Sequence, residues 1–251
     1  MELKQQLDNL YNENAHLNFI ENDPISIPHR FSEKQDIEIA GFFAAIFAWG
    51  QRITIINKTN DLLERMDNAP FDFIRNHKEA DRKQLLGFKH RTFNDEDLLY
   101  VVHRLQRYYR EGEGLEFAFS NHLSSNSITI EDALVAFRDT FFNDQFAPAR
   151  TKKHIATPAN NSSCKRLCMY LRWMVRKDDV DFGIWKSMKP SQLMMPLDVH
   201  VERMARQFNL VTRQQRDWKT VVELTTKLRE FDEDDPVKYD LALFGHSVQL
   251  N

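Results

Sequence analysis

The chain is poor in the residues that build turns, sheets and disulfide frameworks. It has 7 glycines, 8 prolines and 2 cysteines among 251 residues. Few stretches alternate β-branched residues with polar ones, so the composition argues against a protein built from sheets. The two cysteines, Cys164 and Cys168, stand four positions apart, where they cannot bridge comfortably within one helix. Reduced thiols indicate a cytoplasmic protein.

Long hydrophobic runs are also missing. The longest is GFFAAIFAWG at 41–50, which is shorter than the roughly 20 residues that a membrane-spanning helix needs. We therefore expect a buried core helix there and no membrane partner. The acidic, polar start MELKQQLDNLYNEN is not typical of a signal peptide.

Ligands for a metal or a cluster are lacking as well. The histidines stand singly, no cysteine–histidine spacing fits a zinc site, and an iron–sulfur cluster needs four cysteines. There is no phosphate-binding loop and no dinucleotide fingerprint. We expect no metal, no cofactor and a monomeric protein.

What the chain does have is helical periodicity along nearly its whole length. Its 251 residues suffice for one core or two small lobes. The pattern predicts an all-α protein. The expected helices are 2–19, 36–50, 53–67, 70–77, 80–86, 95–111, 115–122, 129–141, 163–177, a short piece near 182–194, 199–209, 213–230 and 235–247.

Charge is distributed unevenly. The net charge is −3, but residues 147–219 hold 15 Lys and Arg against 6 Asp and Glu. A basic segment inside an acidic chain suggests one positive face, as a nucleic-acid partner would need. The alternative is that helical surfaces are rich in Lys and Arg for solubility alone.

Two residues near predicted helix starts, a lysine and an aspartate, are candidates for a catalytic pair. Lys165 stands in the first turn of the helix 163–177, and Asp198 stands at the start of the helix 199–209. A helix N-terminus carries partial positive charge, which disfavours the charged form of a lysine and favours an ionised aspartate. An amine nucleophile beside a fixed carboxylate suits attack on a sugar carbon that develops positive charge. The alternative for Asp198 is an ordinary helix cap.

The segments SSCKRLCMYLRWMVR and PLDVHVERMAR resemble the helix-hairpin-helix (HhH-GPD) DNA glycosylases. In that superfamily a lysine opens the helix after the hairpin, and an aspartate lies in a P-x-D-x-H/R-V stretch. Lys165 and Asp198 are 33 positions apart, a longer separation that looks most like the archaeal 8-oxoguanine glycosylase branch. The chain as a whole also resembles a bacterial family of unknown function, through DPISIPHRF, AAIFAWGQR and DPVKYDLALFG.

The glycosylase resemblance implies a fold, a domain organisation and an activity. The fold would be a single unit over 1–251, with two helical lobes and a central cleft. One lobe would be 53–195, ending in a hairpin-like segment at about 150–177, and the other would combine 1–52 with 196–251. The activity would be excision of an oxidised purine such as 8-oxoguanine from double-stranded DNA. Lys165 would be the nucleophile with possible strand cleavage as a lyase, and Asp198 would assist.

Further residues are candidates for DNA contacts. A flipped base needs an aromatic plane and polar groups at its edge, and phosphates need cations or turn amides. The candidates for the base pocket are Trp49, Gln51, Met169, His200 and Asp235. The candidates for the DNA backbone are Lys152, Lys153, Asn160, Asn161, Ser162, Ser163, Arg166, Arg172 and Arg176.

Each candidate also has an alternative role. Trp49 could pack in the core, Gln51 could end a helix, His200 could lie on the surface, and the arginines could form a solvated face. The turn HIATPANNSSCK lacks the glycines of the superfamily hairpin, although Asn160 and Asn161 can adopt positive φ. Two other functions therefore stay open: a non-catalytic nucleic-acid-binding protein on the same scaffold, or a helical interaction protein.

Overall fold

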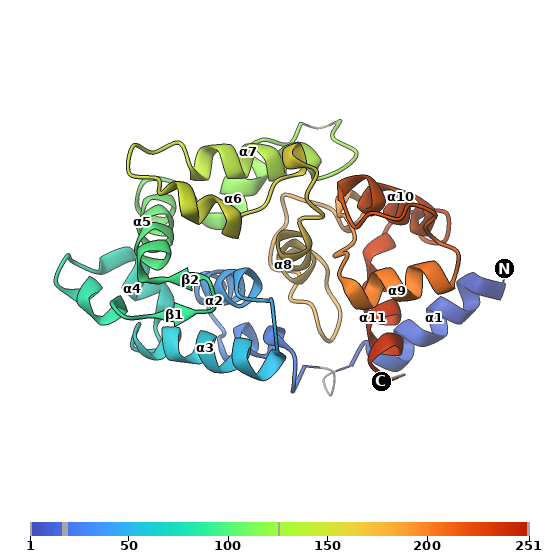
Figure 1. Cartoon of the computed structure of the whole chain (residues 1–251), viewed down its shortest axis with the longest axis horizontal. Helices are drawn as coiled ribbons and strands as arrows, with labels where there is room; N and C mark the ends of the chain where they lie inside the picture. Colours follow the sequence, from blue (N-terminus) through green and yellow to red (C-terminus); the bar gives the residue numbers. More distant parts are fainter. Residues whose placement is uncertain (1, 17–19, 125, 250–251) are drawn as a thin grey trace. The chain divides into compact units, whose positions relative to one another are not determined.

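The structure is a computed structural model of the chain, and it describes residues 2–16, 20–124 and 126–249. Helices make up nearly all of its regular structure (Figure 1), which confirms the all-α prediction. The α-helices of the described residues are α1 (Glu2–Asn14), α2 (Lys34–Ile46), α3 (Arg52–Glu64), α4 (Pro70–Asn76), α5 (Asp95–Glu111), α6 (Gly114–Ser120), α7 (Glu131–Phe141), α8 (Lys165–Val175), α9 (Val199–Gln207), α10 (Trp218–Arg229) and α11 (Tyr239–Gln249). Short 3₁₀ helices are η2 (Pro24–Ser26), η3 (Pro28–Arg30), η4 (Asp81–Leu85), η5 (Ala149–His154), η6 (Pro158–Asn160), η7 (Pro190–Gln192) and η8 (Pro236–Lys238). Strands β1 (Lys89–His90) and β2 (Phe93–Asn94) pair as a small antiparallel hairpin.

Several expected helices differ from what forms. The helix expected at 213–230 begins only at Trp218, and the one expected at 235–247 is a 3₁₀ turn followed by α11 from Tyr239. The piece predicted near 182–194 is an extended loop that ends in η7. Its backbone donors satisfy the end of α8, since Phe182 N and Trp185 N donate to the carbonyls of Trp173 and Met174 at 2.9 Å each. The loop therefore packs along α8 and does not form a helix of its own. The first helix ends at Asn14, and residues 17–19 of the predicted range lie outside the described residues.

The chain divides into two compact units by the density of its internal contacts. Unit 1 comprises Met1–Glu21, Leu123–Val135 and Ala156–Asn251, and unit 2 comprises Asn22–His122 and Ala136–Ile155. These ranges differ from the expected lobes, because α8 and α9 both belong to unit 1. The geometry that relates Lys165 to Asp198 is therefore internal to one unit.

In unit 2 the first part of the apolar run at 41–50 belongs to the buried helix α2, which ends at Ile46 and not at residue 50 as expected. All side chains from Ile37 to Ile46 in α2 are buried. Just after this helix, Phe47 packs against Phe88 and Phe93, with ring centroids 5.5 and 5.0 Å apart. Aromatic pairs at these separations add to the free energy of burial.

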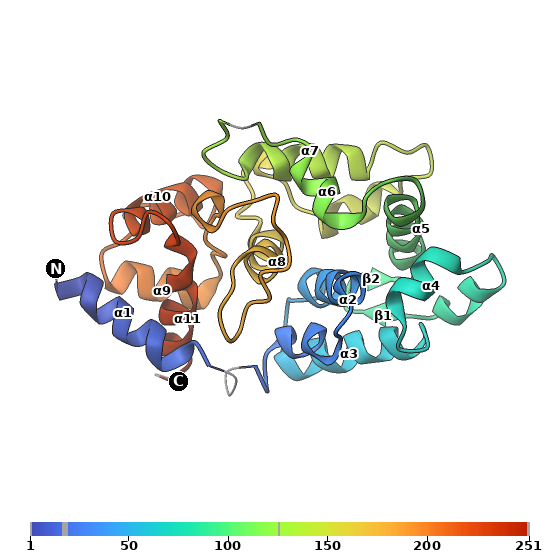
Figure 2. The same ribbon diagram turned by 180° about the vertical axis from the view of Figure 1, so that it is seen from behind.

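Unit 1 is built around α8. Every residue from Leu167 to Val175 is buried, so α8 is covered on all sides instead of presenting one solvated face. Nearby, α11 packs against both α1 and α9, and the three helices lie close together in the reverse view (Figure 2). Gly245 permits the close approach of α11 to α1, because a Cβ at this position would overlap the Asn14 side chain.

Among the described residues, no helix is both long enough and apolar enough to cross a membrane.

Candidate active site

Asp198 is held rigidly at the start of α9. Its backbone is extended, and its Oδ1 accepts hydrogen bonds from the amides of His200 and Val201 at 2.9 Å each. This is the N-cap arrangement, in which a side-chain oxygen satisfies amides that the helix leaves unpaired. Since Oδ1 is fixed, the position of Oδ2 is fixed too. The same two hydrogen bonds therefore cap α9 and fix the position of Oδ2.

Lys165 is the first residue of α8, and its ammonium faces that oxygen. The N-cap residue before it, Cys164, adopts a left-handed backbone with φ of 50°. The Lys165 Nζ lies 3.9 Å from Asp198 Oδ2, and the side chains are 25% and 19% exposed. A separation of 3.9 Å is an ion pair but exceeds the length of a hydrogen bond. The amine is close to the carboxylate, reachable from solvent and not locked to Asp198.

A third charged group of unit 1 pairs with α8 two turns after Lys165. Asp240, in the first turn of α11, is buried and forms an ion pair with Arg172 of α8. Burial raises the pKa of the Asp240 carboxyl to about 6, against the opposing effect of the Arg172 guanidinium; Asp198 raises it further and Lys165 lowers it. Asp240 therefore interacts electrostatically with both members of the pair. Its motif, DPVKYDLALFG, was noted in the sequence, but its role was not foreseen.

Arg172 and Arg176, expected to contact DNA phosphates, do not lie on the surface. Both are buried, and both are bound by carboxylates inside unit 1. Arg172 pairs with Asp181 at 3.2 Å as well as with Asp240. Desolvation of an unpaired guanidinium would be costly, so a buried arginine needs such partners. Neither side chain is available to DNA.

The expectation that Asp235 lines a base pocket is also wrong. Both of its oxygens lie 2.9 Å from Nε of Arg176, and Arg176 also pairs with Asp178 and Asp181. Burial raises the pKa of Asp235, and Arg176 opposes that rise. The carboxylate that was expected to contact a base instead neutralises a buried cation.

We expect Arg176→Ala to destabilise the protein by about 3–5 kcal/mol, because it leaves three carboxylates without their shared cation. Urea denaturation measures the loss. The control is Arg216→Ala, an arginine whose side chain is 40% exposed and whose partner Glu202 lies 3.5 Å away; it should cost less than about 1 kcal/mol. Equal losses in the two variants would contradict the structural role of Arg176.

The turn before α8 folds without glycine. Asn161 takes the left-handed conformation at φ of 54°, and its side-chain amide donates to Asp217 at 3.1 Å. Ser162 forms a backbone bridge with Asp217, and its Oγ accepts from the Cys164 amide at 3.3 Å. Asparagine thus supplies the positive φ that glycine provides elsewhere. The turn follows η6, which is a single 3₁₀ turn.

Asp217 holds that turn against α10. It caps α10 by accepting from the Thr220 amide, and Arg213 pairs with it at 2.8 Å. Desolvation raises the pKa of Asp217, but the hydrogen bonds from Thr220, Arg213 and Asn161 together outweigh it and lower the pKa to about 2. Asn161 is bound to this ionised carboxylate and Ser162 to the backbone of the same residue, so both serve the architecture of the turn.

The other candidates in unit 1 differ in exposure. Asn160 is exposed and Ser163 is partly buried. Met169 is buried one turn along α8. Arg166 is half-buried, and burial lowers its pKa to about 10. His200 is bound to Ser247 Oγ through Nδ1 at 3.2 Å.

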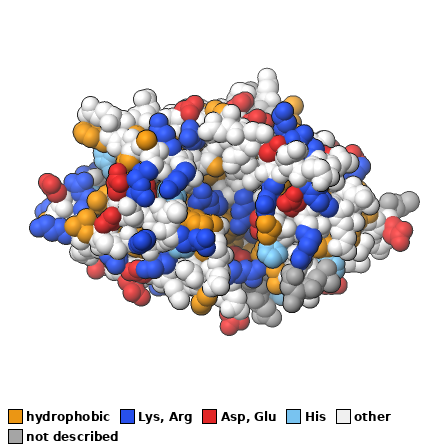
Figure 3. All heavy atoms as spheres, viewed as in Figure 1, with side chains coloured by type: hydrophobic (Ala, Val, Ile, Leu, Met, Phe, Trp, Pro, Cys, Tyr) orange, Lys and Arg blue, Asp and Glu red, His pale blue; other side chains and the backbone are white. Residues whose placement is uncertain are grey.

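Four candidates belong to unit 2. Trp49 stacks on His154 with ring centroids 5.7 Å apart, so it packs within that unit. Gln51, just before α3, is exposed. Lys152 and Lys153 in η5 are exposed too. On the face shown in Figure 3, Lys and Arg side chains lie over both units. The continuous positive face expected from the sequence stays a prediction.

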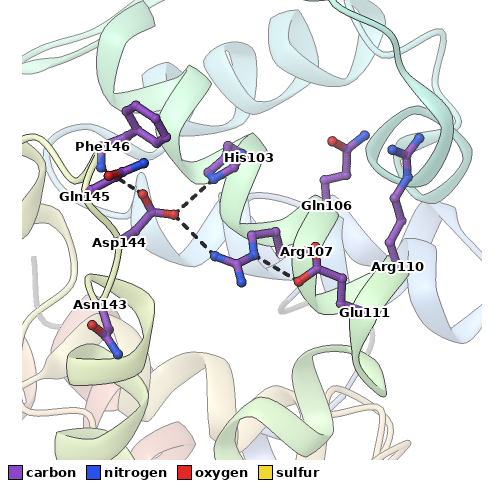
Figure 4. A pocket seen from close by; sticks show the side chains of 9 residues that line it. All are labelled: His103, Gln106, Arg107, Arg110, Glu111, Asn143, Asp144, Gln145 and Phe146. Atoms are coloured by element: carbon purple, nitrogen blue, oxygen red, sulfur yellow. Dashed lines mark hydrogen bonds and ion pairs between the residues drawn. The ribbon is translucent and has the colours of Figure 1, made fainter.

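Unit 2 also holds a cavity of about 540 Å³ between α5 and the segment after α7. Most of its charged side chains pair among themselves (Figure 4). Asp144 accepts from His103 at 3.1 Å and from Arg107 at 3.5 Å, and Arg107 also pairs with Glu111 at 3.0 Å. Because cations and carboxylates cancel, we assign no ligand to this cavity. No group of acidic, cysteine or histidine side chains in the described residues could hold a metal ion.

The fold and these residues define an all-α protein with a lysine–aspartate pair at two helix starts. The sequence profile of one family matches residues 23–249, nearly the whole chain. The chain belongs to that family, which is described as "Protein of unknown function (DUF2400)". Searches of the curated proteins and of the solved structures give no match.

Proposed function

We propose that the protein is a DNA glycosylase with a lyase step, acting on an oxidised purine such as 8-oxoguanine in double-stranded DNA. The observation that carries the proposal is the 3.9 Å separation of Lys165 Nζ and Asp198 Oδ2 at two helix starts. The sequence around each residue resembles the corresponding glycosylase segment. Both groups lie in unit 1 and are partly exposed, so a sugar could reach them.

In the proposed reaction the neutral amine of Lys165 attacks C1′ of the damaged nucleotide. The bond between C1′ and the base nitrogen breaks, and the base leaves with the bonding electron pair and takes up a proton. One proton of the attached nitrogen passes to Asp198, and the other to the ring oxygen as the C1′–O4′ bond breaks. The nitrogen lone pair then forms an imine between Lys165 and C1′. Loss of a proton from C2′ then permits β-elimination of the 3′ phosphate, which cleaves the strand.

Asp198 serves this reaction through its charge. As the base leaves, positive charge develops at C1′ and the ring oxygen, and an ionised carboxylate stabilises it. Since the backbone amides of α9 hold Oδ1, the carboxylate needs no reorganisation during the reaction. The same carboxylate can receive a proton from the Lys165 ammonium.

Borohydride trapping on a panel of duplexes, each carrying one lesion, tests the proposal. Borohydride reduces the imine to a stable amine, so an adduct forms only if a covalent intermediate does. An adduct with an oxidised purine and none with undamaged duplex would support the glycosylase. Absence of an adduct with every lesion would refute it.

Binding to DNA gives a second, independent test of this function. Affinity for duplex DNA should fall steeply with salt, because each neutralised phosphate releases counterions. If Lys152 and Lys153 contact phosphates, replacing both with alanine should reduce the slope of log affinity against log salt by about 2. The control is Lys227→Ala, which lies outside the basic segment and pairs with Glu230 at 2.6 Å. An affinity that does not change with salt concentration would exclude nucleic acid as the partner.

A non-catalytic nucleic-acid-binding protein is the second candidate. Its support is the turn before α8, where the asparagine and serine that replace glycines are bound to Asp217. Salt-dependent binding without any trapped adduct would favour this candidate.

A further inference from the structure

The β1–β2 hairpin of unit 2 has an unusual residue in its turn. His90 pairs with Phe93, so the turn consists of Arg91 and Thr92. Arg91 takes the left-handed backbone conformation at φ of 54°, which glycine or asparagine adopts with less strain in a two-residue turn. Residues held in this conformation cluster at functional sites. The arginine side chain is therefore the feature of this turn that needs an explanation.

The Arg91 side chain lies against the turn between α2 and α3. A Cβ on Gly50 would lie 2.5 Å from Nη1 of Arg91 and 3.5 Å from its Cζ, so the guanidinium rests on the Gly50 backbone. Arg91 is exposed, and no carboxylate of the described residues forms an ion pair with it. The structure thus supports a guanidinium on backbone atoms and leaves it without a neutralising partner in the described part of the chain.

Side-chain contacts join the hairpin to the α2–α3 turn and to η5. Nη2 of Arg150 in η5 donates to the carbonyl of Thr92 at 3.1 Å. The Trp49 ring contacts His90 of the hairpin, with centroids 4.6 Å apart, and stacks on His154 of η5 at 5.7 Å. Three segments that lie far apart in the sequence therefore form one part of unit 2. This part, the hairpin platform, consists of residues 49–52, 89–94 and 149–154.

The hairpin platform carries cations that no carboxylate neutralises. Lys89 and Lys152 are exposed, as Arg91 is, and neither forms an ion pair with a carboxylate of the described residues. Such a surface attracts a polyanion, and the planar fork of a guanidinium matches two oxygens of a phosphate. Because the Trp49 ring packs against two histidines, the surface favours contacts with phosphates over the stacking of unpaired bases. These properties fit the backbone of a duplex.

We propose that the hairpin platform binds the phosphate backbone of duplex DNA and that Arg91 is its principal phosphate contact. The proposal rests on the nucleic-acid partner of the proposed function, and it adds a binding surface in unit 2, separate from the Lys165–Asp198 pair. Arg91 escapes a search for basic segments because it stands outside residues 147–219.

Arg91→Gly separates binding from folding. Glycine adopts the left-handed conformation without strain, so the midpoint of a urea melt should stay at or above the wild-type value. Affinity for an undamaged duplex should fall about 3- to 10-fold at about 0.1 M salt, and the slope of log affinity against log salt should fall by about 1. Arg91→Lys keeps the charge and should retain the wild-type slope. The control is Arg75→Ala, an exposed arginine of α4 in the same unit, which should bind as wild type does.

Equal affinity and slope in Arg91→Gly and wild type would overturn the proposal, and so would an equal loss in Arg75→Ala. If Arg91→Gly does not fold, Arg91→Asn takes its place, because asparagine also tolerates positive φ. The duplex carries no lesion, so a failure of borohydride trapping would refute the glycosylase and leave these affinities unchanged. A wild-type protein that binds no duplex at low salt would overturn both proposals, whereas binding that does not depend on Arg91 would overturn this one alone.

Discussion

Lys165→Gln should abolish the borohydride-trapped adduct with lesion-bearing DNA, a loss of at least about 10³-fold, while the protein stays folded. Glutamine retains a long polar side chain but has no nucleophilic nitrogen, so no imine can form. The Lys165 side chain is partly exposed and its contact with Asp198 is 3.9 Å long, so little packing is lost. Gel separation of the adduct and a urea melt measure the two effects.

Lys177→Gln is the matched control for this prediction. The same substitution is made at an exposed lysine shortly after the same helix. It should trap DNA at the wild-type level. If Lys165→Gln still forms the adduct, another amine is the nucleophile and the proposed mechanism is wrong.

Asp198→Asn should lower the rate of base release by about 10²- to 10⁴-fold with a small loss of stability. Asparagine caps a helix about as well as aspartate, so the bonds to the amides of His200 and Val201 can persist. What disappears is the negative charge facing Lys165 and the sugar. Single-turnover kinetics on the lesion duplex measure the rate.

Asp198→Ala separates the two roles of this residue. It should be as slow as Asp198→Asn and in addition lose about 1 kcal/mol of stability, because the cap is gone. If Asp198→Asn releases base at the wild-type rate while Asp198→Ala only melts earlier, Asp198 is a cap and nothing more.

Much of the fold could be predicted because it depends on local pattern. The helix expected at 95–111 forms over that range, where Asn94 and Asp97 make the reciprocal cap. The helix expected at 163–177 forms over 165–175. Apolar periodicity and cap residues act within a few positions, so one sequence displays them. The hairpin at Lys89–Asn94 was missed because two-residue strands leave almost no alternation to detect.

The site could be predicted only in part, for a related reason. Lys165 and Asp198 were singled out because each marks a helix start, and helix starts are visible in sequence. The structure places the two side chains 3.9 Å apart, and their catalytic role stays a prediction. Arg172 looked like a phosphate contact because the residue that neutralises it, Asp240, lies 68 positions away. A helix that is covered on all sides and one with a solvated basic face can share the same spacing. Only the tertiary partners distinguish them.

The most direct test of the central claim is peptide mapping of the borohydride-reduced complex with duplex DNA containing 8-oxoguanine. The proposed mechanism predicts that the remnant of the sugar is attached to Nζ of Lys165 and to no other lysine. An adduct at a different lysine, or no adduct while the protein binds the duplex, would contradict it.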